Sequence, residues 1–303
     1  MSKKTNYLLF KAKQIKRKIT VEAHKHYSVT RIESYISKKY KRFIGYDMDW
    51  SNPHSYTQKI QYSKVHNHDK MRSLCSDKVA VREYVKKTIG EEYLIPIYGV
   101  WERFEDIDFD KLPNSFVLKT NHGSSTNIIV KDKSKLDMKD ARKKFKRWLK
   151  ENFAYYGFEL HYAPIKPLIY AEQLLDFGDQ GIEDYKFLCF DGNARYFWID
   201  FNRSSNHKRN MYDMDWNLQA WNQWHYGNYD DTVEQPNNFN EMKEVAKKLA
   251  KGFDHVRVDL YNVNGHIYFG ELTFTNGGGY EHIVPQEYDF ILGNCWTLPK
   301  KDN

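Results

Sequence analysis

The sequence predicts a mixed α+β protein, because strand patterns crowd its second half while helical patterns dominate its beginning. Alternating apolar residues between 256 and 272 are typical of a β-hairpin, and a strand–loop–strand pattern spans residues 115–131. These strands do not alternate regularly with helices, as a doubly wound parallel sheet would require. The chain of 303 residues is long enough for one large domain or two modest ones.

The remaining elements are predicted from the period of their apolar residues. Helices are expected at about residues 3–45, Asp77–Lys87, Lys139–Asn152 and Asn240–Lys251. Strands are expected at 115–120, 127–131, Leu168–Leu175, Asp184–Phe190 and Arg195–Phe201. The last two strands form a predicted hairpin around the Asp-Gly pair at 191–192, and the glycine at 252 marks a helix end.

The hairpin near the C-terminal end carries two acids that can share a metal ion. Asn264 and Gly265 supply its left-handed turn, and its apolar positions are Val256, Val258, Leu260, Ile267, Phe269 and Leu272. Asp259 and Glu271 fall on the paired strands, one on each side of the turn. Two neighbouring carboxylates repel unless a cation binds them, and hard oxygen ligands favour Mg²⁺, which in turn indicates a phosphorylated ligand. The alternative is a surface hairpin with two unrelated acids.

A loop of small residues between two strands is suited to binding phosphate. Lys119 lies at the end of the first strand, and Gly123, Ser124 and Ser125 follow before the second. Backbone N–H groups and hydroxyls in such a loop can donate to phosphate oxygens, while a lysine supplies a compact charge. The spacing matches neither a Walker A nor a Gly-x-Gly-x-x-Gly motif. Taken alone, a polar hairpin turn is the simpler interpretation.

Composition indicates a soluble, folded protein. Aromatic residues make up 16% of the chain and charged residues 29%, and the mean hydropathy is −0.80. No apolar run approaches the roughly 18 residues of a membrane span, and the run at 7–10 is too short for a signal-peptide core. Cys75, Cys189 and Cys295 have no metal or disulfide spacing. We therefore expect a cytoplasmic location.

The excess positive charge is confined to the N-terminal segment. Residues 1–45 contain thirteen Lys and Arg against Glu22 and Glu33, a net +11, whereas the remainder has 34 basic against 38 acidic residues, a net −4. Such a segment can lie on an anionic membrane face, contact an acidic polymer or bind nucleic acid, or it can be a solvated helical face. Nucleic acid is the least favoured partner, because no zinc-finger or RNP-type motif is present and the body is acidic.

Two further features give alternative hypotheses. The pentapeptide Tyr-Asp-Met-Asp-Trp occurs at 46–50 and at 212–216, and Asp-x-Asp is found in many metal-dependent glycosyltransferases. The basic segment alone suggests a non-enzymatic module that binds acidic polymer. Lys208 and Arg209 could bind a substrate carboxylate or phosphate, or could form a solvated basic loop.

The order of motifs from Lys119 onward resembles the ATP-grasp superfamily. The elements in order are Lys119, Gly123–Ser125, Glu172–Leu175, Glu183/Asp184 with Lys186, Arg257-x-Asp259 and Glu271. The chain is most similar to the teichuronopeptide-biosynthesis (TupA-like) type over about residues 50–295, on the segments Trp50–Pro53, Lys59–Gln61, Asp77–Val85, Asn121–Ser124, Asp184–Phe187, Asn206–Asn210 and Gly270–Phe274. The resemblance implies an ATP-grasp fold that holds a nucleotide between two mixed or antiparallel sheets. The implied organisation is a basic helical segment at 1–45 and a catalytic region at 46–303, with a nucleotide-clamping lobe at 115–180 and a metal-binding lobe at 181–303.

The resemblance also implies roles for individual residues. The residues implied for ATP are Arg82, Lys119, Gly123, Ser124, Ser125, Glu172, Gln173, Leu174, Glu183, Asp184 and Lys186. Asp259 and Glu271 would bind one or two Mg²⁺. Many members place Asn two residues after the Glu, where this chain has Thr273, so Thr273 or Asn276 would complete the shell. Arg257 and Lys119 would act on the reacting groups, although Arg257 could instead be an ion-pair partner.

The implied reaction is ATP-dependent ligation of a carboxylate to an amine through an acyl phosphate, with release of ADP. The resemblance places such proteins in cell-surface or capsular polysaccharide assembly. It therefore implies an acidic sugar or uronic acid component as the carboxylate and an amino acid or small amine as the nucleophile. The basic segment would then meet an anionic membrane at its inner face.

Overall fold

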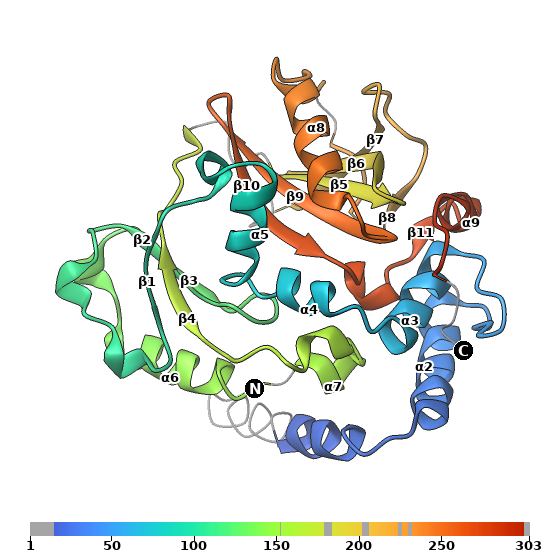
Figure 1. Ribbon diagram of the computed structural model, residues 1–303, viewed down its shortest axis with the longest axis horizontal. Coiled ribbons are helices and arrows are strands. Elements are labelled where there is room, and N and C mark those ends of the chain that lie inside the picture. The colour runs from blue at the N-terminus through green and yellow to red at the C-terminus, as the bar shows by residue number, and fades with distance from the viewer. Residues whose placement is uncertain are drawn as a thin grey trace.

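The computed structural model describes residues 15–151, 153–178, 184–201, 206–223, 226–229 and 232–299. Within these ranges the strands form a four-stranded sheet, a five-stranded sheet and a two-stranded ribbon (Figure 1). Helices flank the sheets, so the expected α+β class is confirmed. No helix in the described ranges is long and apolar enough to cross a membrane.

The smaller sheet has the order β1-β4-β2-β3 and is antiparallel throughout. Its strands are β1 (Ile97–Trp101), β2 (Phe116–Thr120), β3 (Asn127–Val130) and β4 (Ile169–Glu172). Phe116, Leu118 and Ile169 pack against α6 (Met138–Trp148) in one apolar cluster. Because side chains alternate along a strand, Lys119 and Glu172 point away from this helix.

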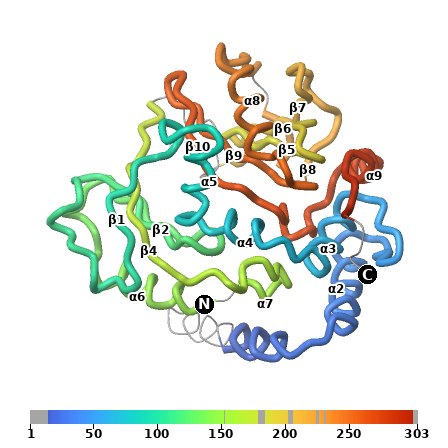
Figure 2. Tube along the Cα trace, in the orientation of Figure 1, coloured from blue at the N-terminus to red at the C-terminus, as the bar shows by residue number. Residues whose placement is uncertain are grey.

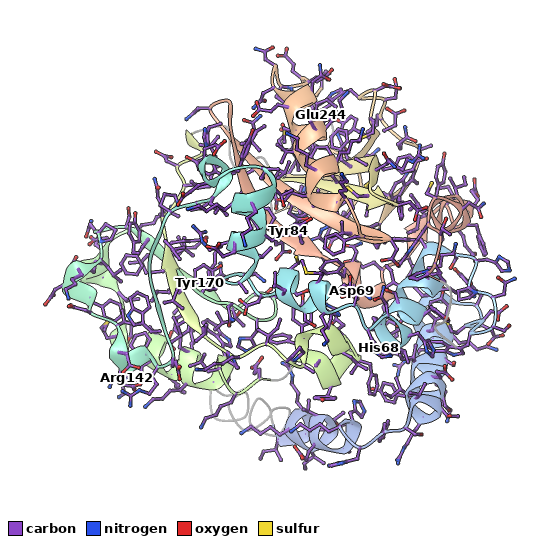
Figure 3. All side chains as sticks on the ribbon, viewed as in Figure 1. His68, Asp69, Tyr84, Arg142, Tyr170 and Glu244 are labelled. Carbon is purple, nitrogen blue, oxygen red and sulfur yellow. The ribbon has the colours of Figure 1, made fainter. Side chains whose placement is uncertain are left out.

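The larger sheet has the order β10-β9-β5-β6-β7, and its neighbours are antiparallel. Its strands are β5 (Asp184–Phe190), β6 (Asn193–Phe201), β7 (Lys208–Asp213), β9 (His255–Val263) and β10 (His266–Thr273). One face is covered by α5 (Val81–Thr88) and α8 (Phe239–Ala250), which share the largest apolar core with it. Tyr84, labelled in Figure 3, ties the two helices together by donating its hydroxyl to the Leu249 carbonyl at 2.9 Å.

The opposite face of the larger sheet is only partly covered. Part of it packs on α3 (Tyr56–His66), α9 (Glu287–Asn294) and the ribbon of β8 (Asn222–Gln223) and β11 (Ile283–Val284). Leu188, Trp198 and Met211 contribute to that second core. The rest of this face is polar and is where the larger sheet meets the smaller one.

The described part of the basic N-terminal segment, residues 15–45, forms two helices rather than one. Residues 15–24 are helical, and α2 (Val29–Ile44) begins after Ser28, whose hydroxyl caps it by accepting from the Arg31 N–H at 3.3 Å. A capping serine satisfies the free N–H groups at a helix start, which explains the break. Residues 1–14 lie outside the described ranges. Figure 2 shows α2 rising beside α3, and its buried residues are Ile32, Ile36, Tyr40 and Ile44.

Other predicted boundaries move for local reasons. The helix expected from Asp77 begins at Val81, because the Asp77 carboxylate accepts from the N–H groups of Val79 and Ala80 and makes a turn. α6 ends at Trp148, short of the expected residue 152. β4 ends at Glu172, where the Gln173 N–H bonds the Pro96 carbonyl at 2.9 Å. The short helices α4 (Lys70–Ser76), α7 (Phe153–Gly157) and η7 (Asn276–Gly279) lie in the connections, and η7 contributes residues to the cleft lining.

Candidate functional site

A polar cleft of about 600 Å³ lies between the two sheets. The small sheet contributes the end of β2, the 123–127 loop and Tyr170, which Figure 3 labels on β4. The large sheet contributes its polar face. Among the described residues, the Lys, Arg, Asp and Glu side chains that line the cleft are Lys78, Lys119, Glu159, Asp184, Lys186, Asp200, Arg209, Arg257, Asp259, Glu271 and Glu281.

The two acids predicted to share a metal lie side by side on the cleft floor. Asp259 on β9 is the direct register partner of Glu271 on β10. The register shifts between Phe269 and Glu271, and this bulge lets Phe269 and Glu271 point to opposite faces although they are two residues apart. A Cβ at Gly270 would lie 3.1 Å from the Asp259 carbonyl oxygen, so the bulge requires a close backbone approach there.

Arg257 joins both acids to the following loop. Its Nε donates to Asp259 Oδ1 at 2.6 Å, and its Nη2 donates to Asp259 Oδ2 at 2.7 Å and to Glu271 Oε1 at 3.0 Å. Its Nη1 donates to Asn276 Oδ1 at 2.6 Å. Arg257 is therefore an ion-pair partner of both acids, as the alternative interpretation of the sequence predicts. The same contacts bring the oxygens of Asp259, Glu271 and Asn276 around one cation.

A second cation, Lys186, closes the acidic cluster from β5. Its Nζ donates to Asp259 Oδ2 at 2.9 Å and to Asp184 Oδ1 at 2.5 Å. Lys186 and Asp259 are register partners, so the two strands fix this contact. Lys186 is 6% exposed and Asp184 only 1%, which makes the pair a buried part of the cleft wall rather than a surface ion pair.

The charges in the cluster shift its pKa values. Burial alone would raise the pKa of Glu271, but Lys78, Arg257 and Lys186 outweigh it and hold that pKa at about 2. Burial would lower the pKa of Arg257, but Asp259 and Glu271 raise it well above its ordinary value. Glu271 is thus a carboxylate and Arg257 a cation at neutral pH, which is the state that metal and phosphate binding require.

The small sheet faces this cluster with a second lysine. Lys119 on β2 forms an ion pair with Glu172 on β4, and both side chains project from the face opposite α6. The loop after β2 is closed by the Thr120 N–H donating to the Thr126 carbonyl at 3.1 Å. Gly123 has φ +78°, and a Cβ there would lie 2.1 Å from the Phe153 ring, so this position needs glycine.

Lys78 is a cleft residue that the sequence reasoning missed. Its Nζ donates to the Gly123 carbonyl at 2.9 Å and lies 3.4 Å from Glu271 Oε2, so it links the small-residue loop to the acid pair. The Asp77-Lys78 pair carries the sequence signal for this residue, whereas the resemblance implies Arg82 as the basic contact. The structure instead directs Arg82 to the Ile95 carbonyl, which its Nη1 bonds at 2.9 Å, and Arg82 is not among the cleft-lining residues.

A glycine-rich loop covers the far side of the acid pair. Gly277, Gly278 and Gly279 have φ of +56°, +60° and +72°, three successive left-handed residues. Gln61 on α3 holds the loop by donating to the carbonyls of Gly278 and Gly279 at 3.0 and 2.8 Å. This positions Asn276, 3% exposed, with its carbonyl oxygen toward Arg257. Thr273, the other predicted third ligand, donates its hydroxyl to Glu271 Oε1 at 3.1 Å.

The donor set at the acid pair fits a hard divalent cation. Two carboxylates and one amide oxygen converge on the position of a single guanidinium, and all are oxygen donors of the kind that Mg²⁺ prefers. Among the described residues no group of three or more His, Cys, Asp and Glu side chains is placed to hold a metal. Any magnesium here would therefore need water or phosphate oxygens for the rest of its shell, as magnesium in nucleotide sites commonly does.

The remaining residues predicted to bind ATP do not all line the cleft. Ser124 and Ser125 are exposed at the mouth of the cleft. Gln173 and Leu174 follow β4 and do not line the cleft, while Glu183 lies outside the described ranges.

Both Asp-x-Asp pairs lie outside the cleft and shape local turns. Asp49 Oδ1 accepts from the N–H groups of Ser51 and Asn52 at 2.9 and 3.0 Å. Asp213 Oδ1 accepts from the N–H groups of Asp215 and Asn217, both at 2.9 Å. Neither Asp-x-Asp pair is among the described residues that line the cleft with Lys78, Lys119 and the two acids.

Two facing sheets with a cleft between them are the ATP-grasp arrangement, and this protein has that fold. A family model described as TupA-like ATPgrasp matches residues 58–297. The chain belongs to that family, which confirms the expected family and fold.

Solved structures show more distant likenesses. D-alanine–D-alanine ligase from Bacillus anthracis is 16% identical with a TM-score of 0.37, over 73% of this chain and 59% of that one. The same enzyme complexed with ATP gives 16% and 0.39, over 75% and 64%. Phosphoribosylamine–glycine ligase from Thermotoga maritima gives 15% and 0.43, over 67% and 48%. The chain thus spans less than two thirds of the length of each of these structures. A comparison with curated proteins found no match.

Proposed function

We propose that this protein is an ATP- and magnesium-dependent ligase that joins a carboxylate to an amine and releases ADP. The observation that carries the proposal is the floor of the cleft, where Asp259 and Glu271 are register partners bound to one arginine. Opposite them, the small sheet presents Lys119 and a small-residue loop. An acid pair facing lysines across a cleft can bind a metal–triphosphate complex from both sides.

The nucleotide would lie between the sheets. Lys119 would leave its ion pair with Glu172 and bind phosphate oxygens, helped by Lys78 and the Gly123–Ser125 loop. The adenine would lie near Glu172 and the following Gln173 and Leu174, at the point where the chain passes from the small to the large sheet. Asp184, 1% exposed on β5, would accept from the ribose hydroxyls, with Glu183 beside it in the sequence.

Asp259, Glu271 and Asn276 would hold the magnesium, and Asn276 is the better third ligand of the two predicted. Its amide oxygen shares Arg257 with both acids, whereas the Thr273 hydroxyl is already a donor to Glu271. Bound magnesium would neutralise charge on the transferring phosphoryl group. On this proposal Arg257 and Lys186 would give up part of their contact with the acids when the metal enters.

The chain's own groups account for the two steps of the reaction. The substrate carboxylate oxygen attacks the γ-phosphorus, the bond to ADP breaks, and an acyl phosphate forms. The amine then attacks the acyl carbon, inorganic phosphate leaves and the amine loses a proton to solvent. Arg257, beside the proposed metal ligands Asp259 and Asn276, would stabilise the oxyanion of the second step. Lys119 would stabilise the charge that moves onto the β–γ bridging oxygen in the first.

The carboxylate substrate is proposed to be an acidic sugar component of a cell-surface polysaccharide, and the nucleophile an amino acid or small amine. This choice follows from the resemblance to the TupA-like type, whose family model matches residues 58–297. The basic N-terminal segment supports a contact with an anionic surface, because Lys38 and Arg42 on α2 are exposed and no described carboxylate lies within 4 Å of either. Ile32 and Ile36 are buried against the body, so this contact would be electrostatic.

The test is a product assay with purified protein, ATP, Mg²⁺ and a matrix of uronic acids or acidic peptides against amino acids. ADP and phosphate should form in quantity only when a carboxylate and an amine are both present, and the amide should be detected by mass. The control replaces ATP with nucleotide sugars. Release of a nucleoside diphosphate from a sugar donor, without an ATP requirement, would instead support the glycosyltransferase alternative.

A further inference from the structure

The cleft continues past the acid pair to a second charged cluster on β6 and β7. Asp200 on β6 and Arg209 on β7 are register partners, and both line the cleft together with His207 and Tyr226. Asp200 is also the register partner of Asp184 on β5, so the cluster lies on the same sheet face as the proposed nucleotide contacts.

Arg209 is held more rigidly than a simple ion pair requires. Its Nε donates to Asp200 Oδ1 at 2.6 Å and its Nη1 donates to Gln223 Oε1 at 2.6 Å. Its guanidinium carbon lies 4.8 Å from the centre of the Trp198 ring and 4.3 Å from that of Tyr226. Two hydrogen bonds and two aromatic faces fix the guanidinium plane, which is how proteins prepare an arginine for a planar anion.

The ion pair inside the cluster limits how much negative charge a bound anion can carry. Asp200 Oδ1 accepts from Arg209 and lies 2.9 Å from His207 Nε2. Burial would raise the pKa of Asp200, but Arg209 outweighs it and lowers that pKa to about 2, so the carboxylate is charged. Because the Asp200 carboxylate offsets the charge of Arg209, the pair is better matched to a monoanionic carboxylate than to a dianionic phosphate.

Trp198 is a neighbour of both Arg209 and Arg257, so it gives an upper limit for the distance between this cluster and the proposed reacting centre. The guanidinium carbons of Arg257 and Arg209 lie 5.5 and 4.8 Å from the centre of this same indole ring. The two carbons are therefore at most about 10 Å apart, the sum of those distances. One small molecule can bridge such a gap.

We propose that Arg209, with His207 and Asp200, binds a second carboxylate of the acceptor while Arg257 faces the carboxyl group that reacts. The acceptor is then a compact diacid, or a polymer with a second carboxylate close to the first. This inference rests on the ligase function proposed above and narrows its substrate class. A buried ion pair adds little to stability compared with apolar packing. A role in binding the acceptor therefore explains why the Asp200–Arg209 pair lines the cleft.

The test compares glutarate with its monoamide, which has the same length but one negative charge. Binding is measured by calorimetry in the presence of Mg²⁺ and a non-hydrolysable ATP analogue. Glutarate should bind about tenfold more tightly to the native protein, since a charge-assisted bidentate contact is worth at least that factor. R209Q should reduce the ratio of glutarate affinity to monoamide affinity toward one. The affinities for the monoamide and for the nucleotide analogue should be unchanged.

Asp200 could destabilise R209Q by losing its buried partner, so D200N/R209Q is measured alongside it and restores a neutral pair. A ratio near one for native protein, no measurable glutarate binding, or an unchanged ratio in the double variant would overturn the proposal. Tighter binding of 4-phosphonobutanoate than of glutarate would overturn the choice of carboxylate. Failure of the nucleotide analogue to bind would instead count against the ligase function.

Discussion

The substitution D259N removes one charge from the centre of the proposed magnesium site with little change of shape. Asp259 is 3% exposed and accepts from Arg257 Nε, Arg257 Nη2 and Lys186 Nζ at 2.6, 2.7 and 2.9 Å. Removing one partner from a buried charge network costs about 3–5 kcal/mol. Because asparagine keeps one accepting oxygen, we expect a loss of about 3 kcal/mol in unfolding free energy and a melting temperature lowered by about 6 °C.

The catalytic loss should exceed what this instability explains. We expect D259N to lower kcat for ADP formation by more than about 10³-fold, equivalent to about 4 kcal/mol of transition-state stabilisation. The assay is run well below the melting temperature of the variant, with circular dichroism confirming that it is folded. The matched control is D215N, because Asp215 is exposed in a turn outside the cleft. More than a tenth of native turnover in D259N, or an equal loss in D215N, would refute the assignment.

Three further substitutions test other parts of the account. K78M should raise the KM for ATP by about tenfold, since one charge-assisted contact is lost; an unchanged KM would remove Lys78 from the nucleotide site. Burial lowers the pKa of Lys64 from 10.5 to about 7. Between those values the unfolded chain binds more protons, so native stability should rise with pH relative to K64M by up to about 1.4 kcal/mol per unit. Parallel denaturation curves for the two proteins across that range would contradict this. K38E/R42E should abolish the retention of the protein on anionic vesicles at low salt, while K143E on α6 should not. Equal retention of the native protein and both variants would exclude α2 as the contact.

The acid pair could be predicted because its geometry is local. Side-chain alternation around Asn264-Gly265 places Asp259 and Glu271 on adjoining strands, and the three-residue step from Phe269 to Leu272 carries the bulge. The same alternation predicts which side chains of β2 and β4 face the cleft and which face α6.

Contacts between distant segments could not be predicted in this way. Lys78 reaches Gly123 and Glu271, and no periodicity in the sequence records that proximity. The repeated Asp-x-Asp pairs show the converse limit, because a short acidic motif can form a turn as readily as it can bind a metal. Arg209 shows a third limit. Its sequence neighbours suggest a solvated loop, whereas strand pairing and two aromatic rings make it a buried wall of the cleft.

The most direct test of the central claim is a crystal structure of the protein with Mg²⁺ and a non-hydrolysable ATP analogue. The account requires a metal ion bound by Asp259 and Glu271, the triphosphate reaching from it toward Lys119, and the adenine beside Glu172. A nucleotide bound elsewhere, or bound in the cleft with its phosphates directed away from the two acids, would contradict the account.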